Sequence, residues 1–354
     1  MSNRENFPSV TIAIPTYNEE EHIEQVIHGF LDMDYPNLLE ILIADGGSED
    51  NTKEIITRIA KNDSRVVMIN NPDKYQSYAL NKMIEIAKGE VFIRADAHCE
   101  YGDSYISRCI ESLHRFEVKN VGGALRFLAQ NLVQAGTAVA VLSLIGNGGA
   151  KHYNPYYEGY SDTVPMGCFW TKDLIALQGY RESNHTNEDA EINYRIIEHL
   201  NGKIYIDPKI ELWYYPRANF SGLFKQYFNY GRGRLLTSIA HEGKIPFRSK
   251  APFVFFCVMI PYFIIDHLFF DRILGSIYIL VAILFVTIAD SMRISLKHRN
   301  YFKEKVWRNN NKTIPKPFSI SLFALLALII MHLAHFMGYS FQLIKARIFK
   351  LNGW

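Results

Sequence analysis

Three long apolar runs in the last third of the chain constrain its fold more than any other feature. They cover residues 251–270, 273–289 and 318–343. Each is close to the roughly 20 residues that a helix needs to cross a bilayer, although the second is short. Buried core helices are the alternative, but three such runs packed so closely exceed an ordinary core. We therefore predict a helical membrane region over residues 251–354.

The net charge of +2 hides opposite balances in the two halves of the chain. Residues 1–216 contain 19 Lys and Arg against 31 Asp and Glu, whereas residues 217–354 contain 19 against 5. An acidic half joined to a basic, apolar half is typical of a soluble domain tied to an anionic lipid surface. The apolar fraction of 48% excludes a disordered chain.

Cysteine spacing and the first residues indicate a cytosolic environment for the acidic half. The four cysteines show neither paired nor zinc-like spacing, which favours reduced thiols. The N-terminal stretch M-S-N-R-E-N-F-P has no apolar core, so we expect no signal peptide.

The basic half divides into an interfacial part and a loop between apolar runs. Residues 217–250 contain aromatic residues at helical spacing beside basic ones, which predicts amphipathic helices in a membrane interface. Residues 292–317 hold eight Lys and Arg and one acid, so the positive-inside rule places them in the cytosol. Runs 251–270 and 273–289, divided by Asp271 and Arg272, would then form a hairpin. Run 318–343 could cross, re-enter or lie at the interface.

The acidic half alternates strand-like and helix-like segments. Strands are expected at 10–14, 39–44, 66–69 and 91–95, with helices at 20–31, 50–60 and 78–87 between them. This order predicts an α/β domain over residues 1–216, with a mostly parallel sheet flanked by helices. Further along we expect an apolar helix at 129–145, a long loop at 146–162, strands at 163–170 and 203–206, and a helix at 188–199. Ligands of such sheets bind at the carboxyl ends of the strands.

Acidic residues gather at those predicted strand ends. Asp45 follows the second strand, Asp96 follows the fourth, and Glu188 and Asp189 open a late helix. Alternate strand residues share a face, so Asp96 and His98 could together hold Mg²⁺ or Mn²⁺ beside a diphosphate. His98 could equally be a surface histidine. Asp189 could be a general base or a helix N-cap, and spacing does not decide between them.

Several motifs together resemble glycosyltransferase family 2. They are Thr11-Ile-Ala-Ile-Pro-Thr-Tyr-Asn-Glu19, Ile41-Leu-Ile-Ala-Asp-Gly-Gly-Ser48, Arg94-Ala-Asp-Ala-His98 and Asn187-Glu-Asp189, in the family's order and covering about residues 8–235. Gly146–Ala150, Glu158–Val164 and Tyr230–Arg234 resemble most closely the succinoglycan-type (ExoA-like) membrane-associated subgroup. The resemblance implies a GT-A fold, in which an α/β domain binds a nucleotide sugar and transfers the sugar with inversion.

The resemblance also implies roles for single residues. Pro15, Tyr17 and Glu19 would frame the base and ribose, Asp45 would bind the uracil, and Gln76 and Asn81 would lie near the base and ribose. Asp96 would meet the ribose and the metal, with His98 as a metal ligand. Asp189 would be the catalytic base with Glu188 beside it. Arg232 and Arg234 would reach the diphosphate or a lipid phosphate.

Two departures from the family pattern bear on the function. The usual D-x-D motif is replaced by Asp96-Ala-His98. The Q-x-x-R-W motif of processive synthases is absent near Gln226–Tyr230, which argues against a polymer-extruding synthase.

We expect a metal-dependent enzyme that adds one sugar, such as glucose from UDP-glucose, to a polyprenyl-diphosphate-linked saccharide. It would work on the cytosolic side of the inner membrane in exopolysaccharide or cell-surface glycan assembly, with anionic lipid and no nucleic acid as partner. Polyprenyl phosphate or a lipid headgroup is the alternative acceptor, and a non-catalytic membrane scaffold is the remaining hypothesis.

Overall fold

The chain forms two compact units in the computed structural model, which describes residues 7–183, 185–270, 273, 275–309, 312–351 and 353–354. The first, called the sheet unit here, comprises the described parts of residues 1–126 and 151–214. The second, the helical unit, comprises those of residues 127–150 and 215–354. The expectations for residues 1–6, Asp271 and Arg272 lie outside the described residues, as does part of the basic segment 292–317.

The sheet unit is built on an eight-stranded mixed sheet with the strand order β3-β2-β1-β4-β9-β6-β10-β8. The first four strands of that order are mutually parallel, and β9 runs antiparallel to β4. The strands are β1 (Val10–Thr16), β2 (Leu38–Asp45), β3 (Val66–Asn70), β4 (Val91–Arg94), β6 (Asn120–Gly122), β8 (Gly159–Ser161), β9 (Cys168–Trp170) and β10 (Ile204–Ile206). A small second sheet has the order β5 (Cys99–Tyr101), β11 (Leu212–Tyr214) and β7 (Leu125–Phe127).

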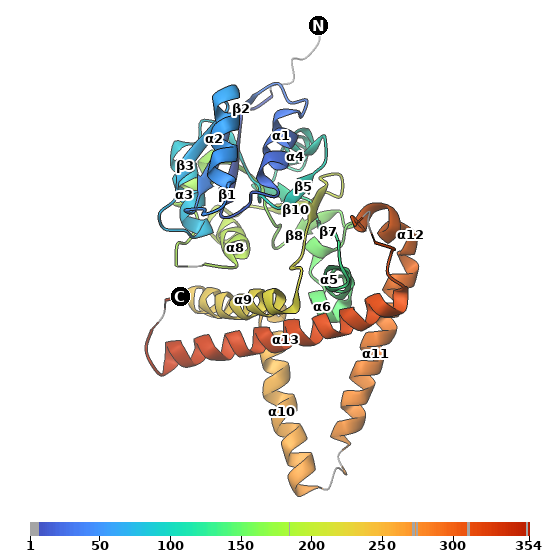
Figure 1. The fold of residues 1–354 in the computed structure, drawn as a ribbon. Coiled ribbons are helices and arrows are strands. Elements are labelled where there is room, and N and C mark those ends of the chain that lie inside the picture. Colours follow the sequence, from blue (N-terminus) through green and yellow to red (C-terminus); the bar gives the residue numbers. More distant parts are fainter. Residues whose placement is uncertain (1–6, 184, 271–272, 274, 310–311, 352) are drawn as a thin grey trace. The chain divides into compact units, whose positions relative to one another are not determined.

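The side-chain alternation of β1 divides the core between the two faces of the sheet. Ile12 and Ile14 pack with α1 (Ile23–Leu31), α2 (Thr52–Asn62) and α4 (Tyr105–Arg115). On the other face Ala13 packs with α3 (Gln76–Ile86) and α8 (Glu188–Leu200), both labelled in Figure 1, and with α7 (Thr171–Ala176). Because both faces are covered, these strands are mostly apolar, and their parallel carboxyl ends meet at one edge.

The long strands and helices lie within a few residues of their expected positions, but the middle of the chain differs. The strand expected at 163–170 is only Cys168–Trp170. The loop expected at 146–162 contains a 3₁₀ turn at Lys151–Tyr153 and strand β8. Three-residue strands are too short to show a period of two, so the sequence pattern could not reveal them.

The helical unit contains α5 (Leu132–Leu142), α6 (Leu144–Asn147), α9 (Phe220–Ala240), α10 (Ala251–Phe269), α11 (Ser276–Lys297), α12 (Arg299–Tyr301) and α13 (Pro317–Arg347). Short 3₁₀ and π-helical turns lie at Phe247–Ser249 and Phe302–Val306. Segment 127–150, expected in the first domain, belongs to this unit instead. It packs there because α5 is buried on nearly all sides and its Gly136 meets the backbone of Phe323 on α13.

Helices α10, α11 and α13 are each long and apolar enough to cross a membrane. Helix α11 extends eight residues beyond the expected end of its run, so the expected basic loop 292–317 begins as helix. The Asp266 carboxylate near the end of α10 accepts a hydrogen bond from the Ser276 backbone N–H at the start of α11, at 2.8 Å. This bond satisfies one of the N–H groups that a helix N-terminus leaves without a partner.

Two glycines let α9 and α13 approach until their backbones touch. A Cβ atom on Gly231 would lie 2.1 Å from the His335 carbonyl oxygen, and one on Gly338 would lie 1.9 Å from the Phe228 carbonyl oxygen. Real Cβ atoms do not come so close to backbone atoms, so any side chain at either position would force the two helices apart.

We expect Gly338→Ala to lower the free energy of unfolding by about 1–3 kcal/mol, since overpacking a close helix contact strains the backbone. Unfolding in detergent micelles measures the effect. The control is Gly29→Ala in α1, where a Cβ would meet nothing within 4 Å and the helix gains an alanine. Equal stability of the two variants would contradict the backbone contact.

Candidate active site

The loops that follow β1 and β2 are tied together by hydrogen bonds. The Asn18 N–H donates to Ser48 Oγ at 2.9 Å, and the Glu19 N–H donates to Thr52 Oγ1 at 2.8 Å. In return the Glu49 N–H donates to Asn18 Oδ1 at 2.8 Å. Asn18 adopts φ of 53°, a left-handed conformation that asparagine tolerates. The two loops therefore form one braced rim at the carboxyl edge of the sheet.

Asp45 shapes this rim from the end of β2. Its carboxylate accepts hydrogen bonds from the Gly47 N–H at 2.9 Å and the Ser48 N–H at 3.0 Å. The residue is 2% exposed. Pro15 pairs with Ala44 within the sheet, whereas Tyr17, just past β1, is 47% exposed. Asp45 thus closes its own turn, and contacts of these residues with a base stay predictions.

Arg94, at the end of β4, organises the carboxylates of the site. Its guanidinium pairs with Asp189, with Glu188 at 3.1 Å and with Asp96 at 3.5 Å. The Arg94 side chain is only 3% exposed. Three carboxylates around one guanidinium leave excess negative charge, which favours a bound cation. The motifs imply no role for Arg94, although an arginine within a buried strand is a signal that it must be paired.

The alternative interpretation of Asp189 as a helix N-cap is wrong. Asn187 occupies the N-cap of α8 with a left-handed φ of 69°, and Asp189 lies in the first turn. Its side chain pairs with Arg94 instead.

The pKa of Asp189 suits a proton acceptor. Burial raises the pKa to about 7, with Glu188 and Asp96 adding to the rise while Arg94 opposes it. A carboxylate with such a pKa can hold or release a proton near neutral pH.

Asp96 and His98 do not lie on a strand, because β4 ends at Arg94 and both follow it in the turn before β5. The expectation that strand alternation aligns them is therefore wrong. The Tyr101 hydroxyl holds the Asp96 backbone, accepting from its N–H at 2.7 Å and donating to its carbonyl at 3.2 Å. Gln76 on α3 donates to the Asp96 carboxylate at 3.0 Å.

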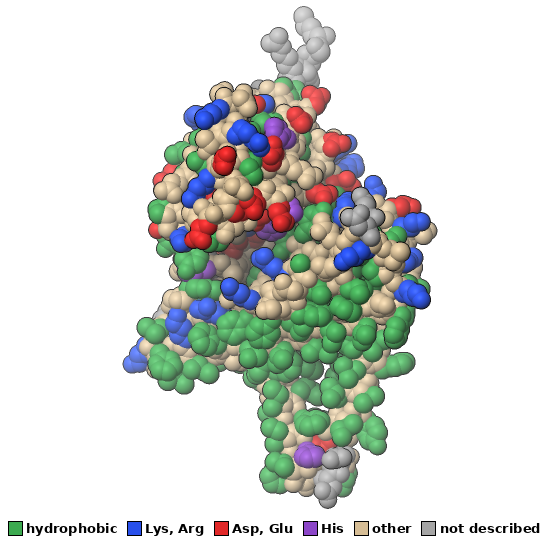
Figure 2. Space-filling model, in the orientation of Figure 1, with side chains coloured by type: hydrophobic (Ala, Val, Ile, Leu, Met, Phe, Trp, Pro, Cys, Tyr) green, Lys and Arg blue, Asp and Glu red, His purple; other side chains and the backbone are tan. Residues whose placement is uncertain are grey.

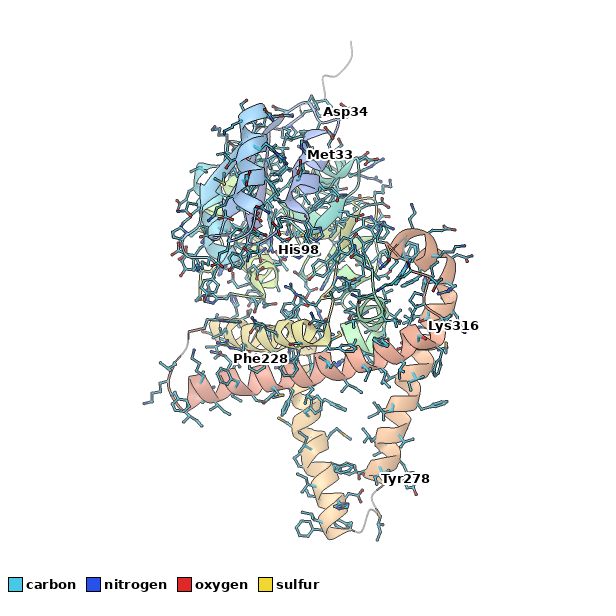
Figure 3. The ribbon with its side chains drawn as sticks, viewed as in Figure 1. Met33, Asp34, His98, Phe228, Tyr278 and Lys316 are labelled. Carbon is cyan, nitrogen blue, oxygen red and sulfur yellow. The ribbon has the colours of Figure 1, made fainter. Side chains whose placement is uncertain are left out.

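His98 is oriented by Glu19, which lies 79 residues away in sequence. Its Nδ1 is 2.9 Å from Glu19 Oε1, and Figure 3 labels His98 in its turn. A carboxylate on one ring nitrogen fixes the tautomer so that the other nitrogen can coordinate, which is the usual arrangement behind a metal-bound histidine. Among the described residues, no group of three or more His, Cys, Asp or Glu side chains gathers for a metal. An Asp and a His suit Mn²⁺ or Mg²⁺ whose remaining ligands are diphosphate oxygens and waters.

The recorded contacts of Asn81 and of the two arginines do not involve the carboxylates around Arg94. The Asn81 amide bonds both the N–H and the carbonyl of Tyr180, at 2.7 and 2.9 Å, which fixes the segment before α8. Arg232 and Arg234 belong to α9 in the helical unit. Arg232 donates to Gln342 at 3.0 Å and stacks over the ring of Trp354, 4.0 Å from its centroid. Their contact with a phosphate stays a prediction.

Comparisons with known proteins agree with the motifs. The family model described as glycosyl transferase family 2 matches residues 11–160. The succinoglycan biosynthesis protein ExoA of Rhizobium meliloti (strain 1021) is 36% identical over 246 residues, which are 69% of this chain and 74% of that protein.

Two further proteins match most of the chain. A dolichyl N-acetyl-α-D-glucosaminyl phosphate 3-β-D-2,3-diacetamido-2,3-dideoxy-β-D-glucuronosyltransferase of Methanococcus voltae is 28% identical over 299 residues, 82% of this chain and 88% of that one. The mannosyltransferase PcManGT from Pyrobaculum calidifontis, solved with GDP-Man and Mn²⁺, has a TM-score of 0.52. It is 16% identical and the match covers 93% of this chain and 88% of that one, a likeness that confirms the GT-A fold.

We expect Glu19→Ala to weaken Mn²⁺ binding about 10–100-fold, because His98 loses the carboxylate that orients it. Isothermal titration with Mn²⁺ and a nucleoside diphosphate measures the affinity. Glu19→Gln, which can still accept from Nδ1, should recover part of the loss. Glu21→Ala, an exposed neighbour, is the control. The role assigned to Glu19 is wrong if its Ala variant binds Mn²⁺ as tightly as this control.

Proposed function

Because the chain belongs to glycosyltransferase family 2 and is a glycosyltransferase, we propose that it transfers one sugar with inversion from a nucleotide sugar to a lipid-linked saccharide. The donor is a UDP-hexose such as UDP-glucose, and the acceptor is a polyprenyl-diphosphate-linked saccharide in exopolysaccharide or cell-surface glycan assembly. The observation that carries the proposal is Asp189, paired with buried Arg94 and poised by its raised pKa to accept a proton.

The chemistry of the transfer follows from the residues around Arg94. Asp189 removes the proton of an acceptor hydroxyl, whose oxygen attacks the anomeric carbon from the face opposite the nucleotide. The C–O bond to the diphosphate breaks, so an α-linked donor gives a β-linked product. Asp96 and His98 would hold Mn²⁺ or Mg²⁺, which when bound neutralises charge on the departing diphosphate. The pairing of Arg94 with the three carboxylates keeps Asp189 in place.

The acceptor class rests on the relatives and on the membrane helices. One relative is named for succinoglycan biosynthesis, and the name of another describes transfer to a sugar on dolichyl phosphate. Three apolar helices support membrane association of this chain. We place the sheet unit on the cytosolic side of the inner membrane, where the basic segment 292–317 meets anionic lipid.

The proposed reaction is tested with radiolabelled nucleotide sugars, Mn²⁺ or Mg²⁺ and a membrane lipid extract. Thin-layer chromatography with mild acid hydrolysis separates a lengthened diphosphate-linked saccharide from a sugar on polyprenyl phosphate or on a lipid headgroup. The first product supports the proposal, and either of the others replaces the acceptor. No metal-dependent turnover of any nucleotide sugar would favour a non-catalytic scaffold.

We expect Asp189→Asn to lower the transfer rate at least about 100-fold, since the amide cannot accept the acceptor proton. Nucleotide binding, followed by calorimetry, should persist because Asp189 is assigned no contact with the nucleotide. Glu85→Gln, which neutralises an exposed carboxylate on α3, is the matched control. Transfer by the Asn variant at the wild-type rate would remove Asp189 from the mechanism.

The transfer rate should also depend on pH in one direction. Only the ionised form of Asp189 accepts a proton, and its pKa is raised to about 7. We therefore expect kcat/KM to fall about tenfold per pH unit below that value and to level off above it. Initial rates between pH 5 and 9 measure the profile. An unchanged rate down to pH 5 would contradict the raised pKa.

A further inference from the structure

Helix α13 has two unlike faces along its whole length. From Phe318 to Ile344 every exposed residue is apolar, and these residues recur every three or four positions, so they share one face. We call them the apolar stripe: Phe318, Leu322, Leu326, Ile329, Leu333, Met337, Phe341 and Ile344. The opposite face is buried and contains small or polar residues such as Ser321, Ala327, Gly338 and Gln342.

The length of α13 fits poorly with an upright orientation. Its 31 residues extend about 46 Å, against about 30 Å of hydrocarbon in a bilayer. The apolar stripe alone covers 27 residues, from Phe318 to Ile344, or about 40 Å. An upright helix would carry part of its stripe into the headgroups on both sides.

The packing of α9 on α13 argues more strongly against crossing. Helix α9 contacts most of the length of α13. Near one end Phe220 of α9 stacks on Phe323 of α13, and near the other Arg232 of α9 donates a hydrogen bond to Gln342 of α13. The close contact of Gly231 with His335 lies within one turn of the middle of α13. If α13 crossed the membrane, the adjacent Arg232 and Arg234 would enter the bilayer centre, where arginine is costly.

Among the described residues, the side-chain contacts of the α10 and α11 hairpin with α13 lie at its open end. Phe253 and Phe256, in the first turns of α10, pack on Phe336, and Ser295, near the end of α11, lies 3.4 Å from Ser321. Beyond these contacts the hairpin projects crosswise from α13 (Figure 1), and hydrophobic side chains cover it (Figure 2). Tyr278 marks its far part and Lys316 the start of α13 (Figure 3).

We propose that α13 lies flat in the membrane interface with the apolar stripe against acyl chains, and that only the hairpin of α10 and α11 enters the hydrocarbon core. The apolar stripe continues the apolar surface of the hairpin. Lys316 precedes α13 and Lys345 and Arg347 lie in its last turn, so both ends can meet anionic headgroups. Lying flat also leaves these cations on one side, in agreement with the positive-inside rule.

Depth measurements along the apolar stripe test the orientation. In a Cys257→Ser background, single cysteines replace Leu322, Leu333 and Phe341 and carry spin labels, with the full chain in vesicles of phosphatidylcholine and phosphatidylglycerol. The three other native cysteines are buried. The collision rate of each label with oxygen, divided by its collision rate with a water-soluble nickel complex, reports the depth of the label in the bilayer. Val258→Cys, on exposed α10, is the deep control.

The in-plane orientation predicts one shallow depth for all three labels, although Leu322 and Phe341 lie about 28 Å apart along the helix. A crossing helix predicts a deep label at Leu333 and shallow labels at the other two, which would overturn the proposal. If the labels at Leu333 are shielded from oxygen, and if the labels of two copies show spin–spin coupling, a second copy of the chain covers the apolar stripe. That outcome would overturn it too.

A sidedness test gives an independent answer. Single cysteines at Lys312 and at Gly353, where a Cβ would meet nothing, are exposed to a membrane-impermeant maleimide in oriented membrane vesicles. We expect both to be labelled from the same side, because α13 does not cross. Labelling from opposite sides would overturn the in-plane orientation. Neither test depends on transfer activity, so failure of the proposed reaction would leave this inference standing.

Discussion

The pairing of buried Arg94 with three carboxylates is the interaction on which the site depends. An arginine cannot shed its charge, so a nearly inaccessible guanidinium at the end of β4 requires anions around it. Asp96 comes from the following turn, and Glu188 and Asp189 come from the first turn of α8. The ion pairs therefore fix the start of α8 against the central sheet. They also hold mutually repelling carboxylates in a small volume. Burial raises the pKa of Asp189, Glu188 and Asp96 add to the rise, and the pairing with Arg94 opposes it while keeping the side chain in place.

Much of the sheet unit could be predicted from local patterns. The strands β1 to β4 and their helices repeat a strong alternation of apolar segments, so their order and the carboxyl edge followed from the sequence. The motif residues Asp45 and Asp189 come where expected, at a strand end and a helix start. The three-residue strands could not be recognised, because a period of two needs more residues to show. Strand alternation does not apply to Asp96 and His98, because both lie beyond Arg94, the last residue of β4.

The rest of the site and of the helical unit depends on contacts between distant residues. Glu19 meets His98 across 79 positions, and a single sequence contains no trace of that pairing. Hydropathy also failed to decide the orientation of α13, because it counts apolar residues without saying which face they occupy. The run 318–343 is apolar for two different reasons. Small residues such as Ala327 and Gly338 serve close helix packing, and large ones such as Leu333 and Phe341 face outward.

The glycine contacts between α9 and α13 have a mechanical consequence. Side chains usually separate two helices, and their rotation can absorb a small displacement of one helix relative to the other. At Gly231 and Gly338 backbone meets backbone, so no side chain is present to absorb it. We therefore expect the two helices to move together as a rigid body. If α13 lies in the membrane interface, a change in bilayer thickness or lateral tension that displaces it would also displace α9, and with it Arg232 and Arg234.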